Sequence, residues 1–196
     1  WDIGEIKNIN KICKENHLGL HLDGARIWNA LVKKEESPLE YGDIFDTISV
    51  CLSKGLGCPI GSVLLGKKEL MKKSIRIRKI LGGAMRQSGY LAAAGIFALE
   101  NNTKRLADDH IRAKEIGEKL INMSFVKKVQ DIETNIIVFE IDKSVKKETI
   151  INAFNKLNIL FDWHSMGTNK IRIVTHINYT KEKHMYLLDS LETLKI

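Results

Sequence analysis

The sequence predicts an α/β protein in two parts. Residues 1–110 form part of a larger domain, and residues 111–196 form a small α+β domain. The apolar run TISVCLS at 47–53 is typical of a strand that helices cover on both faces. After a helix at 103–121 the strands and helices alternate in shorter units, which indicates the second domain. So few strands precede this helix that we expect the larger domain to be incomplete.

Apolar patterning predicts the elements of the first part in order. A helix is expected over Ile3–Glu15, and the alternating run Leu18–Leu22 predicts a short strand that stops where Asp23 begins. The glycine-rich segment GLGCPIG (55–61) joins the long apolar run to a second one, Ser62–Leu65. Because this connection is so short, we expect the two strands to be antiparallel neighbours.

Two further helices complete the first part. The first is basic and ends at Gly82-Gly83. Its positive charges come from Lys67, Lys68, Lys72, Lys73, Arg76, Arg78 and Lys79. The next segment, GYLAAAGIFALEN at 89–101, is apolar nearly all round, so we expect it to be buried or to lie at a subunit interface.

The second part begins with the amphipathic helix at 103–121. Its expected inner face consists of Leu106, Ala113, Ile116 and Leu120. The patterning then predicts strands at 134–141, 159–163 and 170–175, with helices at 147–157 and 180–194.

Composition and charge bear on the class of protein. A hydrophobic content of 44% and a charged content of 28% fit an ordinary soluble globular chain. No apolar run approaches the ~20 residues of a membrane helix, so we expect no membrane partner. The net charge of +7 raises the question of nucleic-acid binding. Because no aromatic residues interleave the basic helix, we expect its charges to decorate an exposed face and expect no nucleic-acid partner.

The cysteines indicate the compartment. Cys13, Cys51 and Cys58 form an odd number and lack the spacing of a metal site. This usage favours a reducing cytoplasm. The histidines also show no ligand spacing, so the sequence predicts no metal site.

Lys54 is a candidate catalytic residue because it directly follows the apolar run and precedes a glycine. Burial at such a place disfavours the ammonium form, and a neutral lysine amine attacks carbonyls and forms Schiff bases. The alternative is a lysine that extends from the end of a strand into solvent.

Asp23 stands where an apolar strand stops, with Gly24 directly behind it. A buried, unpaired carboxylate is costly, so either a cation faces Asp23 or the position is exposed. A carboxylate that caps the following turn or helix fits the spacing equally well.

Taken together, the two residues predict a cofactor site. Asp23 and Lys54 both follow apolar strands, and ligands of open α/β sheets bind at the carboxyl ends of the strands. A lysine Schiff base and a carboxylate facing a pyridinium nitrogen are the means by which proteins hold pyridoxal phosphate. The cation that faces Asp23 would then be the protonated ring of this cofactor.

Longer segments around these residues resemble a known family. HLDGARIWNA (21–30), LSKGLGCPIGSVLLG (52–66) and RKILGGAMRQSGYLAAAGIFAL (78–99) are similar to the low-specificity L-threonine aldolases of the β-eliminating lyase group. KIRIVTH (170–176) resembles the last active-site strand of that family. The likeness covers nearly the whole chain. It implies part of a fold type I pyridoxal-phosphate-dependent, transferase-like large domain followed by a small α+β C-terminal domain.

The resemblance also implies roles for five residues. Lys54 would hold the cofactor covalently and later move the α-proton of the substrate. Asp23 would pair with the pyridine nitrogen, and Arg26 would lie near the phenolic oxygen of the cofactor. Arg172 would bind the substrate carboxylate. Arg86 would help to hold the cofactor phosphate, across a dimer interface.

These positions can also be interpreted without any bound ligand. Arg26 could be a surface arginine in the first turn of a helix, and Arg172 a solvated residue on a strand edge. Arg86 could stand at a helix N-terminus with no anion. Ser53 could do no more than shape the turn before the lysine, and His21 is expected to pack beside the site rather than to act in it.

The implied reaction is the cleavage of L-threonine or L-allo-threonine to glycine and acetaldehyde. Two alternatives stay open: another pyridoxal-phosphate-dependent β-eliminating lyase, or a truncated, non-catalytic remnant of the fold. The family carries a preceding segment with the phosphate-binding turn, a ring-stacking histidine and the base for the hydroxyl proton. We therefore expect this chain to be the C-terminal part of such an enzyme, inactive by itself, whose subunits form a homodimer or homotetramer.

Overall fold

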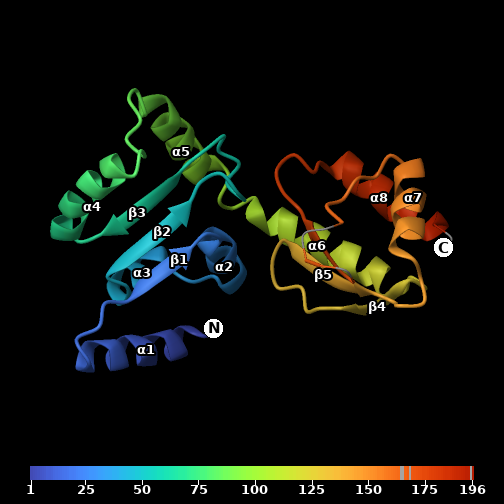
Figure 1. Ribbon diagram of the computed structural model, residues 1–196, viewed down its shortest axis with the longest axis horizontal. Helices are drawn as coiled ribbons and strands as arrows, with labels where there is room; N and C mark the ends of the chain where they lie inside the picture. Colours follow the sequence, from blue (N-terminus) through green and yellow to red (C-terminus); the bar gives the residue numbers. More distant parts are fainter. Residues whose placement is uncertain (164–165, 168, 195) are drawn as a thin grey trace. The chain divides into compact units, whose positions relative to one another are not determined.

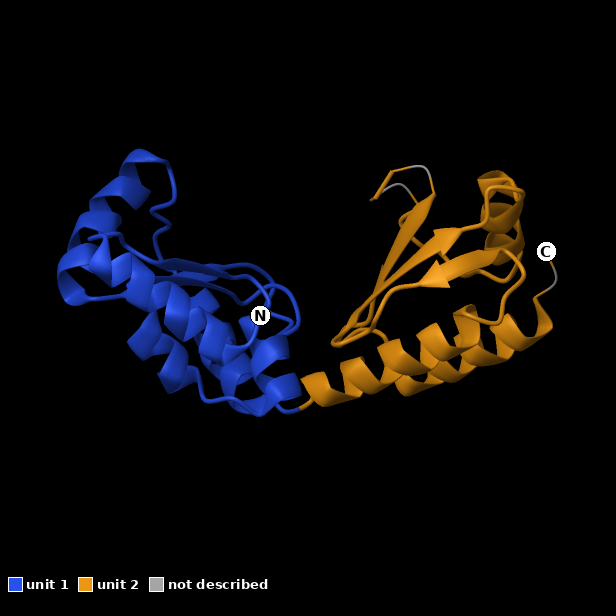
Figure 2. Ribbon diagram, turned by 90° about the horizontal axis from the view of Figure 1, so that it is seen from below, with its two compact units in different colours: residues 1–104 blue, residues 105–196 orange. Residues whose placement is uncertain are grey.

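The computed structural model describes residues 1–163, 166–167, 169–194 and 196. These residues form two units, 1–104 and 105–196, which Figure 2 distinguishes by colour. The first unit contains a mixed sheet of β1 (His21–Gly24), β2 (Thr47–Cys51) and β3 (Ser62–Gly66). Its helices are α1 (Ile3–Glu15), α2 (Ile27–Lys34), α3 (Pro38–Ile44), α4 (Lys68–Ile80) and α5 (Gly89–Asn101), all visible in Figure 1.

The strand pairing of the first unit follows the sequence closely. β1 and β2 run parallel, with Asp23 opposite Ser49, and β2 and β3 run antiparallel, with Cys51 opposite Ser62. The predicted antiparallel pair is therefore confirmed. β1 lies slightly later than predicted, so that Asp23 belongs to the strand itself.

The core of the first unit lies on one face of its sheet. Ile48 and Val50 are buried there and pack with Leu31 of α2 and Tyr41 of α3. The alternate residues of β2 are Thr47, Ser49 and Cys51, which are only half-buried. The prediction that helices cover this strand on both faces is therefore wrong for the chain described here, since only one face is tightly packed.

Local signals account for where the first helices begin. α1 starts as predicted, at a capping box in which the Asp2 side chain accepts from the amide of Gly4 and Glu5 accepts from the amide of Asp2. α3 was not predicted, although Ser37 caps it and Pro38 occupies its first turn. α2 was considered only as the helix whose first turn would contain Arg26, because its eight residues offer little room for helical periodicity.

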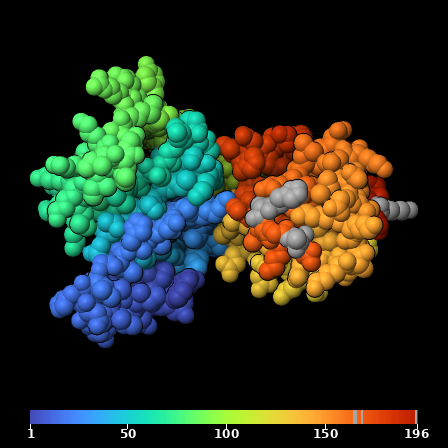
Figure 3. Space-filling model, viewed as in Figure 1, coloured from blue at the N-terminus to red at the C-terminus, as the bar shows by residue number. Residues whose placement is uncertain are grey.

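The last elements of the first unit are largely exposed. Every residue of β3 is exposed, and α4 buries none of its residues. α5 buries only Gly95 and Ala98, whereas Ile96 and Phe97 are 58% and 62% exposed. Of the two alternatives predicted for this helix, burial is not observed within the chain, and a position at a subunit interface stays a prediction. The exposed segment from α4 to the start of α5 forms the green surface of the first unit in Figure 3.

The second unit is an antiparallel sheet with helices. Its strands β4 (Val126–Val129), β5 (Ile136–Ile141) and β6 (Lys170–Val174) lie in the order β4-β5-β6. Its helices are α6 (Leu106–Leu120), α7 (Lys147–Lys156) and α8 (Lys181–Thr193). Large apolar side chains fill the core, among them Phe125, Phe139, Phe154, Ile137 and Ile171. The expected inner face of α6 is buried as predicted.

The junction of the two units differs from the predicted boundary. We expected it near residue 110, which lies inside α6. The boundary in the sequence falls instead between residues 104 and 105. α6 packs against β4, β5 and α8, so the helix belongs to the second unit from its first turn.

The predicted strand at 159–163 does not form, and β4 was not predicted. Phe161 and Trp163 pack on Phe154, with ring centroids 5.0 and 5.5 Å from its ring. The carbonyl oxygen of Trp163 accepts a hydrogen bond from the ammonium group of Lys147 rather than from a neighbouring strand. The side chains of Phe161 and Trp163 therefore pack in the core, while the backbone of residues 159–163 pairs with no strand.

Candidate active site

The candidate site begins at the carboxyl end of β1. Gly24 allows β1 to approach β2 closely, because a Cβ atom at this position would lie 2.6 Å from the carbonyl oxygen of Ser49. Any side chain here would clash with backbone. The glycine therefore fixes Asp23 beside the neighbouring strand.

The carboxylate of Asp23 is exposed on the half-buried face of the sheet. Its Oδ1 accepts a hydrogen bond from the amide of Ala25 at 3.1 Å, so the capping role that we considered is present. This bond uses one of the two oxygens. No ion pair with Asp23 is found among the residues described, and Oδ2 remains available to a cationic ligand.

Lys54 lies in the turn that leaves β2. The amide of Gly57 donates to its carbonyl oxygen at 3.0 Å, and the amide of Cys58 donates to that of Leu52 at 3.1 Å. Gly57 adopts φ 77°, a conformation that favours glycine. These bonds hold the backbone of the turn and leave the Lys54 side chain exposed. Of the two alternatives that the sequence left open for this lysine, the chain described here shows the one in which the side chain extends from the end of the strand into solvent.

The topology brings Asp23 and Lys54 to the same edge of the sheet. β1 and β2 are parallel neighbours, so their carboxyl ends lie side by side. Lys54 follows the end of β2 by three residues, at the edge where open α/β sheets bind ligands. The expectation that both residues lie at the carboxyl ends of strands therefore agrees with the strand arrangement. Both side chains are exposed, which was one of the alternatives for each.

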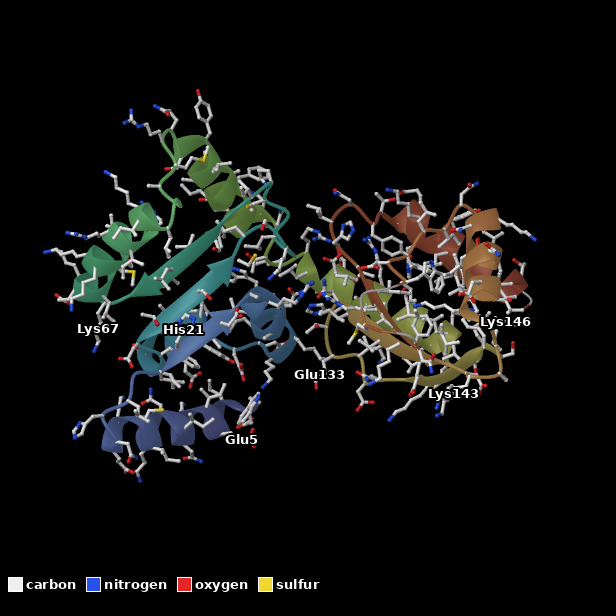
Figure 4. All side chains as sticks on the ribbon, in the orientation of Figure 1. Glu5, His21, Lys67, Glu133, Lys143 and Lys146 are labelled. Atoms are coloured by element: carbon white, nitrogen blue, oxygen red, sulfur yellow. The ribbon has the colours of Figure 1, made fainter. Side chains whose placement is uncertain are left out.

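Further polar residues share the face of Asp23, and sequence reasoning did not single them out. Ser49 stands opposite Asp23, and Thr47 stands opposite His21. Nδ1 of His21 lies 2.8 Å from the hydroxyl of Thr47, and Figure 4 labels this histidine on β1. The alternation of polar and apolar residues within TISVC is the signal that could have identified this face.

The environment of the Lys54 turn includes two free thiols. Sγ of Cys51 lies 3.6 Å from the hydroxyl of Ser53, and Sγ of Cys58 lies 3.6 Å from the carbonyl oxygen of Ala94. Burial raises the pKa of the Cys58 thiol, which therefore packs against α5 as a neutral side chain. The turn is thus anchored to α5 through a neutral contact.

Arg26 and Arg86 occupy different environments in the first unit. Arg26 is the N-cap residue of α2 and is half-buried, three residues after Asp23. Arg86 is exposed in the turn between α4 and α5. Arg26 is therefore held beside the candidate site, whereas Arg86 belongs to an open segment.

Arg172 belongs to the second unit. It lies in the middle of β6, opposite Val138 of β5, and is half-buried. Ile171 and Ile173, its neighbours in the strand, are buried on the opposite face. No hydrogen bond or ion pair to its guanidinium group is found among the described residues, so this group is available to a carboxylate.

No cluster of three or more histidine, cysteine, aspartate or glutamate residues with metal-binding geometry occurs among the residues that the structure describes. None of the described helices combines the length and the apolar character needed to cross a bilayer.

Comparison with known sequences identifies relatives. The sequence model of the family described as beta-eliminating lyase matches residues 1–144. A low-specificity L-threonine aldolase from Escherichia coli is 38% identical over 179 residues, which cover 91% of this chain and 51% of that protein. A probable low-specificity L-threonine aldolase from Arabidopsis thaliana is 36% identical over 192 residues, covering 96% of this chain and 54% of the relative. The chain thus spans about half the length of these curated relatives.

Comparison with solved structures identifies the fold. A putative aromatic amino acid β-eliminating lyase/threonine aldolase from Exiguobacterium superposes with a TM-score of 0.82 at 19% identity, covering 98% of this chain and 57% of that one. A putative L-allo-threonine aldolase from Listeria monocytogenes gives a TM-score of 0.80 at 18% identity, covering 98% and 56%. These likenesses confirm the predicted α/β, fold type I architecture.

Proposed function

The chain belongs to the beta-eliminating lyase family, and we propose that its protein is a pyridoxal-phosphate-dependent aldolase that cleaves L-threonine and L-allo-threonine to glycine and acetaldehyde. The observation that carries this proposal is the placement of Asp23 and Lys54 at one carboxyl edge of the β1–β2 pair, inside the region that the family model matches. The names of the relatives supply the substrate class. The chain covers about half of their length, so the activity is proposed for the whole protein.

The chemistry of the side chains fits this cofactor. Asp23 offers a second carboxylate oxygen on an exposed face, which suits a protonated ring nitrogen. No partner for the ammonium group of Lys54 is found among the described residues, so the amine can form a covalent bond to an aldehyde. The close approach of strands at Gly24 holds the carboxylate in place.

Five residues of the chain would act on the cofactor or the substrate. Pyridoxal phosphate, when bound, supplies an electron sink for the bond that breaks at the α-carbon of the amino acid. Asp23 would keep a proton on the ring nitrogen, and Arg26 would stabilise negative charge on the phenolic oxygen. Lys54 would hold the cofactor and move the proton at the α-carbon. Arg172 would bind the substrate carboxylate through two parallel hydrogen bonds, and Arg86 would contribute to phosphate binding.

The two alternatives predict different results. Another β-eliminating lyase would release pyruvate and ammonia rather than glycine and acetaldehyde. A non-catalytic remnant would release neither. The names of the curated relatives favour the aldolase, because they describe low-specificity L-threonine aldolases.

The test is to trap the cofactor on Lys54. The whole protein is incubated with pyridoxal phosphate, reduced with borohydride and digested, and the peptide that contains Lys54 is examined by mass spectrometry. We expect the mass of the reduced cofactor on Lys54 and none in a Lys54→Ala variant. Labelling of Lys67 or Lys68 in place of Lys54 would overturn the assignment. Product analysis with L-threonine then distinguishes aldol cleavage from β-elimination.

We also propose that the protein assembles as a homodimer or homotetramer in the cytoplasm. The exposed apolar side chains on the first unit support assembly, since such patches mark interaction surfaces. They include Val63, Leu64, Leu65, Ile75, Ile77, Ile80, Leu81, Ile96 and Phe97. Three free cysteines support a reducing compartment.

A further inference from the structure

The second unit contains a cavity of about 560 Å³, formed by β6, α8 and the segment after α7. This volume is in the range of small-molecule sites. Ile173 and Val174 are consecutive in β6 and point to opposite faces, so the cavity lies along the edge of this strand. Apolar residues dominate its wall: Ile116, Ile159, Leu160, Phe161, Ile173, Val174 and Leu187.

A chain of three polar residues ends at this cavity. Nε2 of the buried His184 lies 2.6 Å from a carboxylate oxygen of Glu115, and Nδ1 lies 3.2 Å from the hydroxyl of Tyr179. A carboxylate only accepts, so Nε2 carries a proton, and in the neutral imidazole Nδ1 accepts the proton of the phenol. Burial raises the pKa of Tyr179, which therefore stays protonated. Its oxygen donates to His184 and keeps lone pairs that can accept a further hydrogen bond, and Tyr179 is one of the residues of the cavity wall.

The cavity wall also carries two hydrogen-bond donors. The ammonium group of Lys183 lies 3.1 Å from the carbonyl oxygen of Asn178, which orients this side chain and leaves further donor hydrogens. Nδ1 of His176 accepts from the amide of Asn178 at 3.1 Å. The ring proton of a neutral His176 is therefore on Nε2, which can donate to a ligand. Both groups suit an anionic ligand group.

An acceptor balances these donors. Glu182 lines the same cavity next to Lys183. A hydrogen bond from the Thr180 side chain lowers the pKa of Glu182, so its carboxylate is ionised at neutral pH. With the Tyr179 oxygen, it suits a cationic, hydrogen-donating group. The wall therefore offers complementary charges of both signs beside a large apolar surface.

We propose that this cavity binds a free α-amino acid with an apolar side chain. Lys183 and His176 would face its carboxylate, and Glu182 and the Tyr179 oxygen would face its ammonium group. The apolar wall would receive the side chain. This set of groups matches a zwitterion with one apolar substituent, and a purely apolar ligand would leave the charged groups without partners.

The proposed binding does not depend on the proposed aldolase activity. Arg172, the proposed partner of the substrate carboxylate, precedes Ile173 in β6 but is not among the described residues that line the cavity. Lys54 belongs to the first unit. A Lys54→Ala variant is therefore expected to bind the amino acid as the parent chain does.

The test is calorimetric titration of the chain with L-leucine. Two analogues serve as probes of the charged groups: 4-methylpentanoate, which lacks the ammonium group, and 3-methylbutylamine, which lacks the carboxylate. We expect saturable binding of L-leucine to one site and at least about tenfold weaker binding of either analogue. Absence of saturable L-leucine binding, or equal binding of the analogues, would overturn the proposal.

Variants then locate the site. Lys183→Gln and Tyr179→Phe are each expected to weaken L-leucine binding by about tenfold. Lys181→Gln is the matched control, because Lys181 is exposed on the same helix outside the cavity wall. Near-ultraviolet circular dichroism of the aromatic side chains, which include the buried Trp163, checks that each variant is folded. Unchanged affinity in Lys183→Gln, an exposed position where folding is not at risk, would refute the assignment.

Discussion

Arg105 and Asp109 form an ion pair one turn apart in the first turns of α6, with Nη2 of Arg105 2.5 Å from Oδ1 of Asp109. The Asp109 side chain is fully buried. Its second oxygen and Nη1 of Arg105 are both buried without a hydrogen-bond partner among the described residues. The pair therefore depends on a single contact within the second unit.

Replacing Arg105 by methionine is expected to destabilise the second unit by about 3 kcal/mol, because the buried carboxylate of Asp109 loses its partner. Urea unfolding followed by tryptophan fluorescence measures this change in a background that carries Trp1→Phe and Trp28→Phe, so that Trp163 of the second unit is the reporter. Lys104→Met is the control, since Lys104 is exposed, and is expected to alter the free energy of unfolding by less than about 0.5 kcal/mol. Equal effects of the two substitutions would contradict the role of the ion pair.

Thr175 joins β6 to the same helix. Its hydroxyl donates to the carbonyl oxygen of Asp109 at 2.7 Å, and Asn135 donates to the Thr175 carbonyl oxygen at 2.7 Å. Thr175→Val removes the hydroxyl at nearly constant volume and is expected to cost about 1–2 kcal/mol of unfolding free energy. Thr175→Ser keeps the hydroxyl and serves as the comparison. A valine variant as stable as the parent chain would show that this hydrogen bond contributes nothing.

Gly24 is the most sensitive glycine of the candidate site. Gly24→Ala would place a Cβ atom 2.6 Å from the Ser49 carbonyl oxygen and is expected to destabilise the β1–β2 pair by about 2 kcal/mol. Gly42→Ala is the matched control, because nothing lies within 4 Å of its Cβ position in α3. Hydrogen exchange of the β2 amides reports on the change. Equal protection in the two variants would argue against the close strand contact.

Asp142 gives a pH-dependent prediction. The hydroxyl and the amide of Ser144 donate to its carboxylate at 2.7 and 2.8 Å, and these bonds lower the pKa of Asp142. A carboxyl group whose pKa is lower in the folded state adds stability above its unfolded-state pKa, and this stability is lost as the pH falls through the folded-state value. Ser144→Ala is expected to raise the pKa of Asp142, measured by NMR titration of its carboxyl carbon. Ser88→Ala, at an exposed residue of the first unit, should leave it unchanged.

Local signals in the sequence were sufficient for several elements. α1 coincides with the predicted helix, because its capping box and apolar periodicity lie within the segment itself. The β2–β3 pair was predictable from the short glycine-rich connection. The inner face of α6 was also predictable, because the 3.6-residue periodicity of its apolar residues is visible without knowing which element the helix packs against.

Features that depend on distant partners were not predictable. The aromatic residues of 159–163 pattern like a strand, yet Phe161 and Trp163 pack around Phe154 and the backbone pairs with no strand. The apolar composition of α5 predicted burial, but composition does not state which surface covers a helix. The relation of Asp23 to Lys54 followed from the rule for strand ends, whereas their exposure depends on what faces the sheet.

The outer strand β3 has a practical consequence. It reads SVLLG, has no charged residue, exposes every side chain and forms the edge of the described sheet next to β2. An exposed, uncharged edge of this kind is a template for strand addition by other chains, as in amyloid. Preparations of the isolated chain are therefore expected to aggregate through residues 62–66. A lysine introduced at Leu64 would act as a gatekeeper against this aggregation.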